Sequence, residues 1–96
     1  MFIVNIIYKK PLEIVDHYLA AHRDFLEEGY QKNYFIVSGP RHPRTGGILI
    51  SHLKSREQLQ AIIEVDPFYI HQVADYDIVE FNPVKYHPQF SYFINN

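Results

Sequence analysis

Cysteine is missing from this chain of 96 residues, and its absence narrows the available chemistry. No disulfide can brace the fold, and no thiolate can attack a substrate or bind a metal. The absence also fits a reducing compartment, so we expect a cytoplasmic protein. Tryptophan is missing as well, yet aromatic residues make up 16% of the chain because tyrosine and phenylalanine are frequent.

Long hydrophobic runs and an excess of positive charge are missing too. The apolar start of the chain, "MFIVNII", is far too short to span a membrane, and no basic segment precedes it as in a secretion signal. The formal net charge is −2. Without a basic stripe to release counterions from phosphates, we expect no nucleic-acid partner and no membrane partner.

The composition that remains is that of one small folded domain. Hydrophobic residues make up 47% and charged residues 21% of the chain, which is ordinary for a globular protein. A chain of this length buries roughly 60–65% of its unfolded surface, so it holds a single limited core.

The pattern of apolar residues predicts four strands and two helices in the order βαββαβ. β-Branched and aromatic runs indicate the strands, and apolar residues at three- and four-residue spacing indicate the helices. This order is typical of an α+β, ferredoxin-like fold, with a four-stranded antiparallel sheet and two helices on one face. The predicted strands are residues 2–8, 34–39, 46–53 and 75–82, and the helices are residues 12–32 and a segment opening at 55–58.

Local signals support these helix ends. Ser55, with Gln58 three residues later, is a capping-box pattern, and Asn33 is a plausible left-handed stop for the first helix. Asp66 before Pro67 is typical of an N-cap with proline at the first helical position. The first helix should bury one stripe of side chains, which we place at Ile14, Tyr18, Ala21, His22, Phe25 and Leu26.

The strands carry apolar side chains on both faces, although the two helices can cover only one. Phe2, Val4 and Ile6 alternate with Ile3 and Ile7, for example. A second copy of the chain is the simplest cover for the other face, so we expect a homodimer or a higher homo-oligomer. A long hairpin loop or the chain end folding back is the alternative.

The chain end differs from the rest in composition. We divide the sequence into a domain at residues 1–83 and an aromatic tail at residues 84–96. The tail holds Tyr86, Phe90, Tyr92 and Phe93. So many aromatic side chains are not normally left in water as one patch, so we expect the tail to dock at a subunit interface. A partly disordered end is the alternative.

Two residues, His22 and Asp66, could form a proton-transfer pair. A carboxylate that accepts from one imidazole nitrogen fixes the ring tautomer and makes the other nitrogen a better base. An aspartate that caps a helix can still do this, since one oxygen can bind backbone amides and the other the imidazole. The alternatives are a core histidine and a plain N-cap, and a separation of forty-four residues does not decide between them.

Metal and anion binding have weaker signals. His17 and His22 project about 140° apart around a helix and cannot chelate together, and the other histidines lack ligand spacing, so we expect no metal and no cofactor. The segment "GPRHPRTGG" gathers Arg41, His42 and Arg44 beside glycines and could receive an anionic substrate group. Solvated hairpin charge is the alternative.

Several segments together resemble the YciI-like family of the dimeric α/β-barrel superfamily. They are "AAHRDFL" with His22, "SGP" at 38–40, "TGG" at 45–47, "SREQLQAIIEVDPF" ending near Asp66, and "YDIVEF". The resemblance implies a ferredoxin-like protomer that forms a homodimer. It also implies that His22 and Asp66 correspond to the family's proposed active-site pair, with Ser38 near the same pocket. The family includes a dehydrochlorinase, and the superfamily includes muconolactone isomerases.

Two hypotheses follow. In the first, the protein is a cofactor-free enzyme that moves protons in an elimination, isomerisation or hydrolysis of a small oxygenated molecule. His22 and Asp66 would be catalytic, and Ser38, Gly39, Arg41 and Arg44 would bind substrate. In the second, the protein is a small-ligand-binding or assembly module in which His22 and Asp66 only support the structure.

Overall fold

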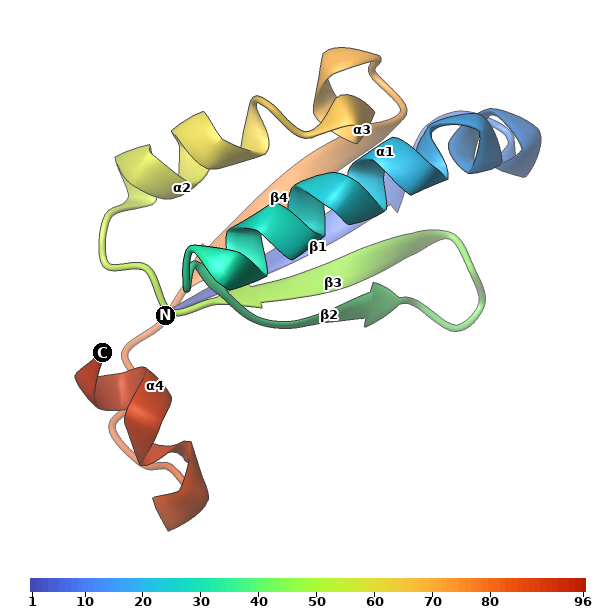
Figure 1. The fold of residues 1–96 in the computed structure, drawn as a ribbon. Coiled ribbons are helices and arrows are strands. Elements are labelled where there is room, and N and C mark those ends of the chain that lie inside the picture. Colours follow the sequence, from blue (N-terminus) through green and yellow to red (C-terminus); the bar gives the residue numbers. More distant parts are fainter.

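The computed structural model describes all 96 residues, and its elements follow the predicted βαββαβ order (Figure 1). A short third helix stands between the second helix and the last strand, and two further helical segments form the chain end. The elements are β1 (Phe2–Tyr8), α1 (Leu12–Gln31), β2 (Phe35–Pro40), β3 (Gly46–Ser51), α2 (Arg56–Ile63), α3 (Pro67–Ile70), β4 (Ala74–Glu80), the 3-10 helix η1 (Pro88–Phe90) and α4 (Ser91–Asn95).

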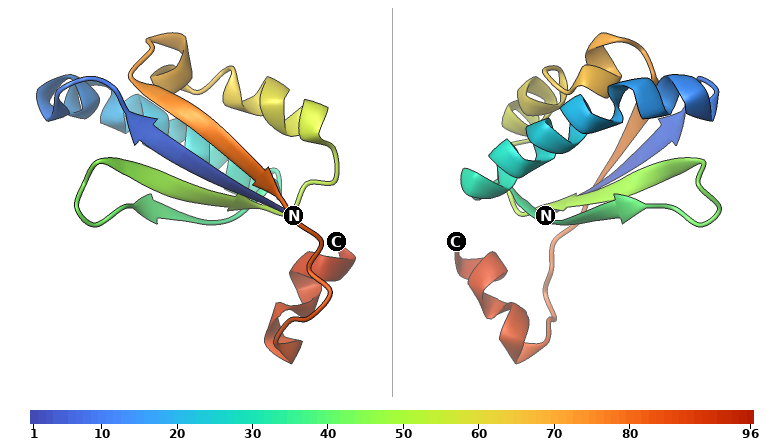
Figure 2. Two further views of the ribbon diagram at one scale, coloured as in Figure 1. Left: turned by 180° about the vertical axis from the view of Figure 1, so that it is seen from behind. Right: turned by 45° about the vertical axis from the view of Figure 1, so that its right-hand side comes forward.

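The four strands form one antiparallel sheet in the order β2-β3-β1-β4, which confirms the predicted ferredoxin-like fold class. The central strand β1 pairs with both β3 and β4, so that Val4 lies opposite Leu49 on one side and Ile78 on the other. Helices α1, α2 and α3 all lie on the same face of the sheet (Figure 2). None of the helices is both long and apolar enough to cross a bilayer.

The core fills the space between the sheet and these helices. Phe2, Val4 and Ile6 of β1 point into it and are almost fully buried. Burying one such side chain contributes about 1.5–3 kcal/mol to stability. The other core residues are Val15, Phe35, Leu49, Leu59, Ile63, Phe68, Val73 and Ala74.

The buried stripe of α1 agrees with the predicted one at His22, Tyr18, Phe25 and Leu26, the last three being partly buried against the core, and differs at two positions. Its fully buried positions are Val15, His22 and Gly29, spaced by two helical turns, whereas Ile14 and Ala21 are exposed. Gly29 is required by a close approach, because a Cβ atom there would lie 2.1 Å from Cε2 of Phe35. The absence of a side chain at Gly29 therefore allows α1 to pack closely against β2.

The predicted stops and caps are present. Asn33 has a φ of 61°, in the left-handed region, directly after the end of α1. The Ser55 hydroxyl accepts a hydrogen bond from the backbone N–H of Gln58 at 3.1 Å, which caps α2. Asp66 caps α3, and Pro67 is its first residue.

The sheet face opposite the helices stays open in the single chain. Val37 and Val79 on this face are 51% and 50% exposed, and Ile7 is also exposed. The prediction that strands carry apolar side chains on both faces therefore holds. A second copy as the cover of this face remains a prediction.

The tail extends beyond the end of the sheet, away from α1 and α2 (Figures 1 and 2). It touches the domain through His52, whose Nδ1 donates to the carbonyl oxygen of Asn96 at 3.0 Å and whose ring meets that of Phe93 edge-on. Tyr86 and Tyr92 remain exposed. Docking of the tail at a subunit interface stays a prediction.

Candidate functional site

His22 lies on the sheet-facing side of α1 and is only 8% exposed. Its imidazole stacks on the ring of Phe68, with ring centroids 4.0 Å apart and planes inclined by 5°. This stacking fixes the tilt of the imidazole, since a parallel ring at that distance leaves it little room to rotate.

Asp66 faces His22 from the start of α3. It is 1% exposed, and its Oδ1 accepts hydrogen bonds from Nδ1 of His22 at 2.8 Å and from the backbone N–H of Phe68 at 3.0 Å. The helix cap and the contact with the imidazole therefore share one oxygen, not two different oxygens as we expected from the sequence. The local sequence explains this placement, because a proline disfavours helical geometry at the residue before it. Asp66 is therefore extended, and its carboxylate reaches the backbone N–H of Phe68 at the start of α3.

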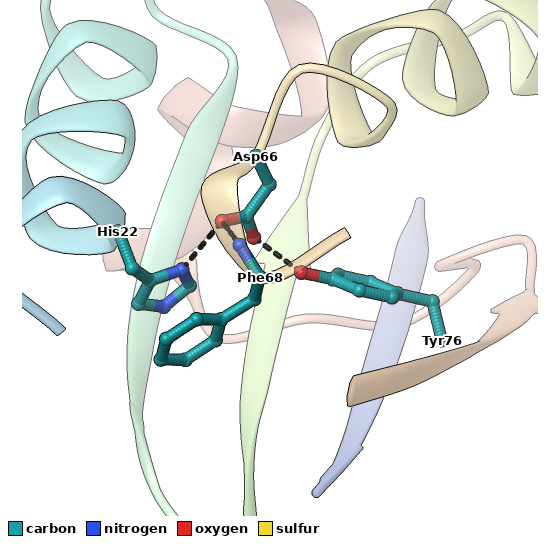
Figure 3. A network of polar contacts seen from close by, with 4 residues as sticks. All are labelled: His22, Asp66, Phe68 and Tyr76. Atoms are coloured by element: carbon teal, nitrogen blue, oxygen red, sulfur yellow. Dashed lines mark hydrogen bonds and ion pairs between the residues drawn. The ribbon is translucent and has the colours of Figure 1, made fainter. Parts of the chain in front are cut away.

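The second oxygen of Asp66 binds a residue that the sequence analysis did not single out. The hydroxyl of Tyr76, on β4, donates a hydrogen bond to Oδ2 of Asp66 (Figure 3). Burial of the phenol, and then the negative charge of Asp66, raise the pKa of Tyr76 above its ordinary value of 10. Tyr76 therefore remains protonated and serves as a hydrogen-bond donor.

These contacts define the state of the imidazole. A carboxylate oxygen only accepts, so Nδ1 of His22 carries the hydrogen. In the neutral ring Nε2 then bears the free lone pair. Nε2 of His22 has no hydrogen-bond partner in the protein. It is also not fully buried, because the only fully buried side-chain polar atom without a partner is Nε2 of His52, so Nε2 of His22 reaches solvent. The arrangement presents an oriented base to its surroundings.

His22 opens into a cavity of about 440 Å³ between α1, the loop from β2 to β3, and the sheet. On α1 its lining follows the i, i+3, i+4, i+7 spacing of one helix face. A volume of this size is that of a small-molecule site. The lining residues are Ile6, Tyr8, Leu19, His22, Arg23, Leu26, Ser38, Gly39, Pro40, Arg44, Gly47, Ile48 and Phe68.

Three of the four residues predicted to bind substrate line this cavity: Ser38, Gly39 and Arg44. The hydroxyl of Ser38 lies 2.6 Å from that of Tyr30, and Nη2 of Arg44 pairs with Asp16 Oδ1 at 2.6 Å. Arg41 does not line it. Its Nη1 instead donates to Oδ1 of Asn5 at 3.2 Å.

Asn5 alternates along β1 with the core residues Val4 and Ile6, so it belongs to the sheet face opposite the helices. Arg41 is therefore drawn toward that face. Arg23, which the sequence analysis did not name, lines the cavity in its place. A signal for Arg23 was its position three residues before Leu26, since residues at that spacing share a helix face.

No group of three or more His, Asp or Glu side chains is arranged to hold a metal ion. His17, which the spacing separates from His22, instead packs its ring edge-on against Tyr18.

Comparisons with known proteins agree with the fold. No curated protein shows significant sequence similarity to the chain. One similar solved structure is 5-chloro-2-hydroxyhydroquinone dehydrochlorinase, TftG, from Burkholderia phenoliruptrix, in complex with 2,5-dihydroxybenzoquinone. It is 22% identical, with a TM-score of 0.70, and the match covers 85% of this chain and 94% of that chain. A family model described as the YCII-related domain matches residues 1–82, and the chain belongs to that family.

Proposed function

We propose that the protein is a cofactor-free acid–base enzyme that uses His22 to move a proton in an elimination, isomerisation or hydrolysis of a small oxygenated molecule. The observation that carries the proposal is the oriented imidazole of His22, whose Nδ1 is held by Asp66 while its other nitrogen is free beside a cavity. Positioned groups of this kind contribute roughly 10²–10⁴-fold to a rate.

The proton transfer follows from the hydrogen-bond pattern. Nε2 of the neutral imidazole accepts a proton from the substrate or, in a hydrolysis, from the attacking water, and the carboxylate of Asp66 stabilises the imidazolium that forms. The imidazolium then returns the proton to another atom of the substrate or to the leaving group, so His22 ends as it began. Tyr76 supports the step from behind, because its hydrogen bond to Oδ2 holds the carboxylate in place.

The cavity offers groups that could hold substrate oxygens. The hydroxyl of Ser38 and the guanidinium of Arg44 both line it, and Gly39 brings backbone to the same wall. The dehydrochlorinase with a similar fold acts on a chlorinated hydroxyhydroquinone. Loss of hydrogen chloride is an elimination, which makes chlorinated hydroquinones a reasonable first class of substrate to test.

The proposed working form is a homodimer, in which the open sheet faces pack together and the tail docks at the subunit interface. The exposure of Val37 and Val79 in the single chain supports the first contact. The exposed rings of Tyr86 and Tyr92 support the second, because such rings are more stable when covered.

The test is chloride release from 5-chloro-2-hydroxyhydroquinone by the wild type and by His22→Gln. We expect the wild type to release chloride and the variant to lose roughly 10²–10⁴-fold in rate with its fold intact by circular dichroism. His17→Gln is the matched control, since His17 lies on the same helix but outside the cavity. An unchanged rate in His22→Gln refutes the role of His22, and a wild-type rate no higher than that of buffer rejects this substrate class.

A second candidate function, a non-catalytic binding or assembly module, is favoured by one observation. The carboxylate of Asp66 joins three elements, since it binds His22 of α1, Phe68 of α3 and Tyr76 of β4. Thermal melting of His22→Ala, Asp66→Ala and the double variant separates the two functions. Asp66→Ala should lose stability under either function, so His22→Ala decides between them. A large loss in His22→Ala that is strongly coupled to the loss in Asp66→Ala favours the module, whereas an unchanged or improved stability of His22→Ala favours an active site.

A further inference from the structure

The charge lining the cavity differs in sign from that of the whole chain. Two guanidinium groups, Arg23 and Arg44, line the cavity and no carboxylate does, although the chain carries a formal net charge of −2. Asp66, the nearest acidic group to His22, is 1% exposed and does not belong to the lining. A ligand in the cavity therefore meets two guanidinium groups and no carboxylate in the lining, although Asp16, outside the lining, pairs with Arg44.

The cationic groups and the apolar groups occupy different depths. His22, Phe68 and Ile6 are buried, whereas Arg23 is exposed and the Arg44 side chain is 37% exposed. The cavity thus has a buried end with an imidazole and apolar walls, and an open end with two cations. An amphiphilic molecule would enter with its apolar body first and its charge toward the opening.

The two arginines differ in how far they are already neutralised. Arg44 is paired with Asp16, so that pair has no net charge, although a guanidinium has donors left for a second acceptor. The side chain of Arg23 forms no ion pair and no hydrogen bond with the protein. All donors of the Arg23 guanidinium are therefore available to a ligand, whereas the Arg44 guanidinium is held in position by Asp16.

We infer that the cavity selects an organic anion: a molecule with a body about the size of one ring and a carboxylate or an acidic enol or phenol. Arg23 and Arg44 bind its charged group, and its body lies against Phe68 with the reacting atom toward Nε2 of His22. This inference rests on the proposed function only for the placement of the reacting atom. Guanidinium groups suit such oxygen acids because their planar donors match two oxygens at once.

The test compares two probes of the same shape, benzoate and benzamide, by titration of backbone amide NMR signals. We expect benzoate to bind about tenfold more tightly to the wild type, with shifts at Gly39 and Gly47 in the cavity wall. Arg23→Gln should remove most of the preference for benzoate over benzamide. Arg44→Gln should also weaken benzoate binding, because it removes a guanidinium group and leaves the carboxylate of Asp16 unpaired. Added salt should weaken benzoate binding but leave benzamide binding unchanged.

Arg56→Gln is the matched control, because Arg56 begins α2, away from the cavity, and donates to the carbonyl oxygen of Ile78. It should bind benzoate as the wild type does. Equal affinity for the two probes, no detectable benzoate binding at millimolar concentration, or an unchanged preference in Arg23→Gln each overturns the inference.

His22→Gln keeps this test separate from that of the proposed function. The variant should retain the preference for benzoate, because His22 does not hold the charged group. A preference that disappears in Arg23→Gln while turnover survives in His22→Gln would refute the catalytic proposal and leave the anion site standing. Loss of turnover in His22→Gln, together with equal binding of benzoate and benzamide by the wild type, would support the catalytic proposal and refute the anion site.

Discussion

Replacing Asp66 with asparagine or with alanine separates its charge from its hydrogen bonds. In Asp66→Asn the side-chain oxygen can still accept from Nδ1 of His22 and from the N–H of Phe68, in the place of Oδ1. The amide nitrogen, in the place of Oδ2, can donate to the hydroxyl oxygen of Tyr76. Asparagine caps helices about as well as aspartate, so the cap of α3 should survive.

The magnitudes follow from these contacts. Asp66→Asn exchanges hydrogen bonds to a charged group, at about 1.5–3 kcal/mol each, for neutral ones near 1 kcal/mol each. A neutral amide costs less to bury than a carboxylate, which offsets part of this difference, so we expect a net loss of about 1–2 kcal/mol in unfolding free energy. Asp66→Ala leaves the buried groups of His22 and Phe68 without a partner and removes the cap. We expect it to cost about 3–5 kcal/mol, a large part of a total stability of about 5–15 kcal/mol.

Chemical denaturation of the three proteins measures these losses, and ¹⁵N NMR of the His22 ring reports which nitrogen carries hydrogen. In Asp66→Asn the hydrogen should stay on Nδ1, yet turnover should fall by roughly tenfold to a thousandfold, because no charge stabilises the imidazolium. Equal destabilisation by both substitutions would refute the hydrogen-bond reasoning. Full turnover in Asp66→Asn would refute the electrostatic role of Asp66.

Three further predictions concern Tyr76, Gly29 and Val37. Because the pKa of Tyr76 is raised, the unfolded chain loses the phenol proton above pH 10 while the folded chain keeps it, so this group lowers the stability there by about 1.4 kcal/mol per pH unit. Denaturation between pH 9.5 and 11 should therefore show a shallower loss of stability for Tyr76→Phe than for the wild type. Parallel stability curves for the two proteins would contradict this. Gly29→Ala should destabilise by about 1–3 kcal/mol despite the helical preference of alanine, because its Cβ meets Phe35, and a higher melting temperature speaks against that packing. Val37→Lys should convert a sedimenting dimer to a monomer, and a monomeric wild type rejects the proposed interface.

The fold could be predicted because its signals are local. Ser55 and Asn33 each mark a helix end within a few residues, and the structure has both. The buried stripe of α1 was predicted correctly from Tyr18 to Leu26 except at Ala21, and was misplaced at its start, because apolar residues surround the first turn and spacing alone does not choose between Ile14 and Val15. Gly29 decides it, since its contact with Phe35 fixes which side of the helix faces the sheet.

The site could be predicted only in part. Nothing local links His22 to Asp66, and the resemblance to the YciI-like family supplied that pairing, which the structure shows as a contact of 2.8 Å. Tyr76 was missed because a tyrosine in a strand is an ordinary strand former, and its role depends on β4 lying beside α3. The opposite directions of Arg41 and Arg44 depend on the shape of the hairpin, which composition does not specify.

The segment from Asp66 to Phe68 shows why this site is tied so closely to the fold. Asp66 caps α3 and accepts a hydrogen bond from the imidazole of His22, and Pro67 is the first residue of that helix. The ring of Phe68 stacks on the same imidazole, and the backbone N–H of Phe68 donates to Asp66. Three consecutive residues therefore set the tautomer, the tilt and the depth of one histidine. A change in this turn should alter the orientation of the base and the stability of the domain together, so substitutions at the cavity rim are the ones that could change ligand preference alone.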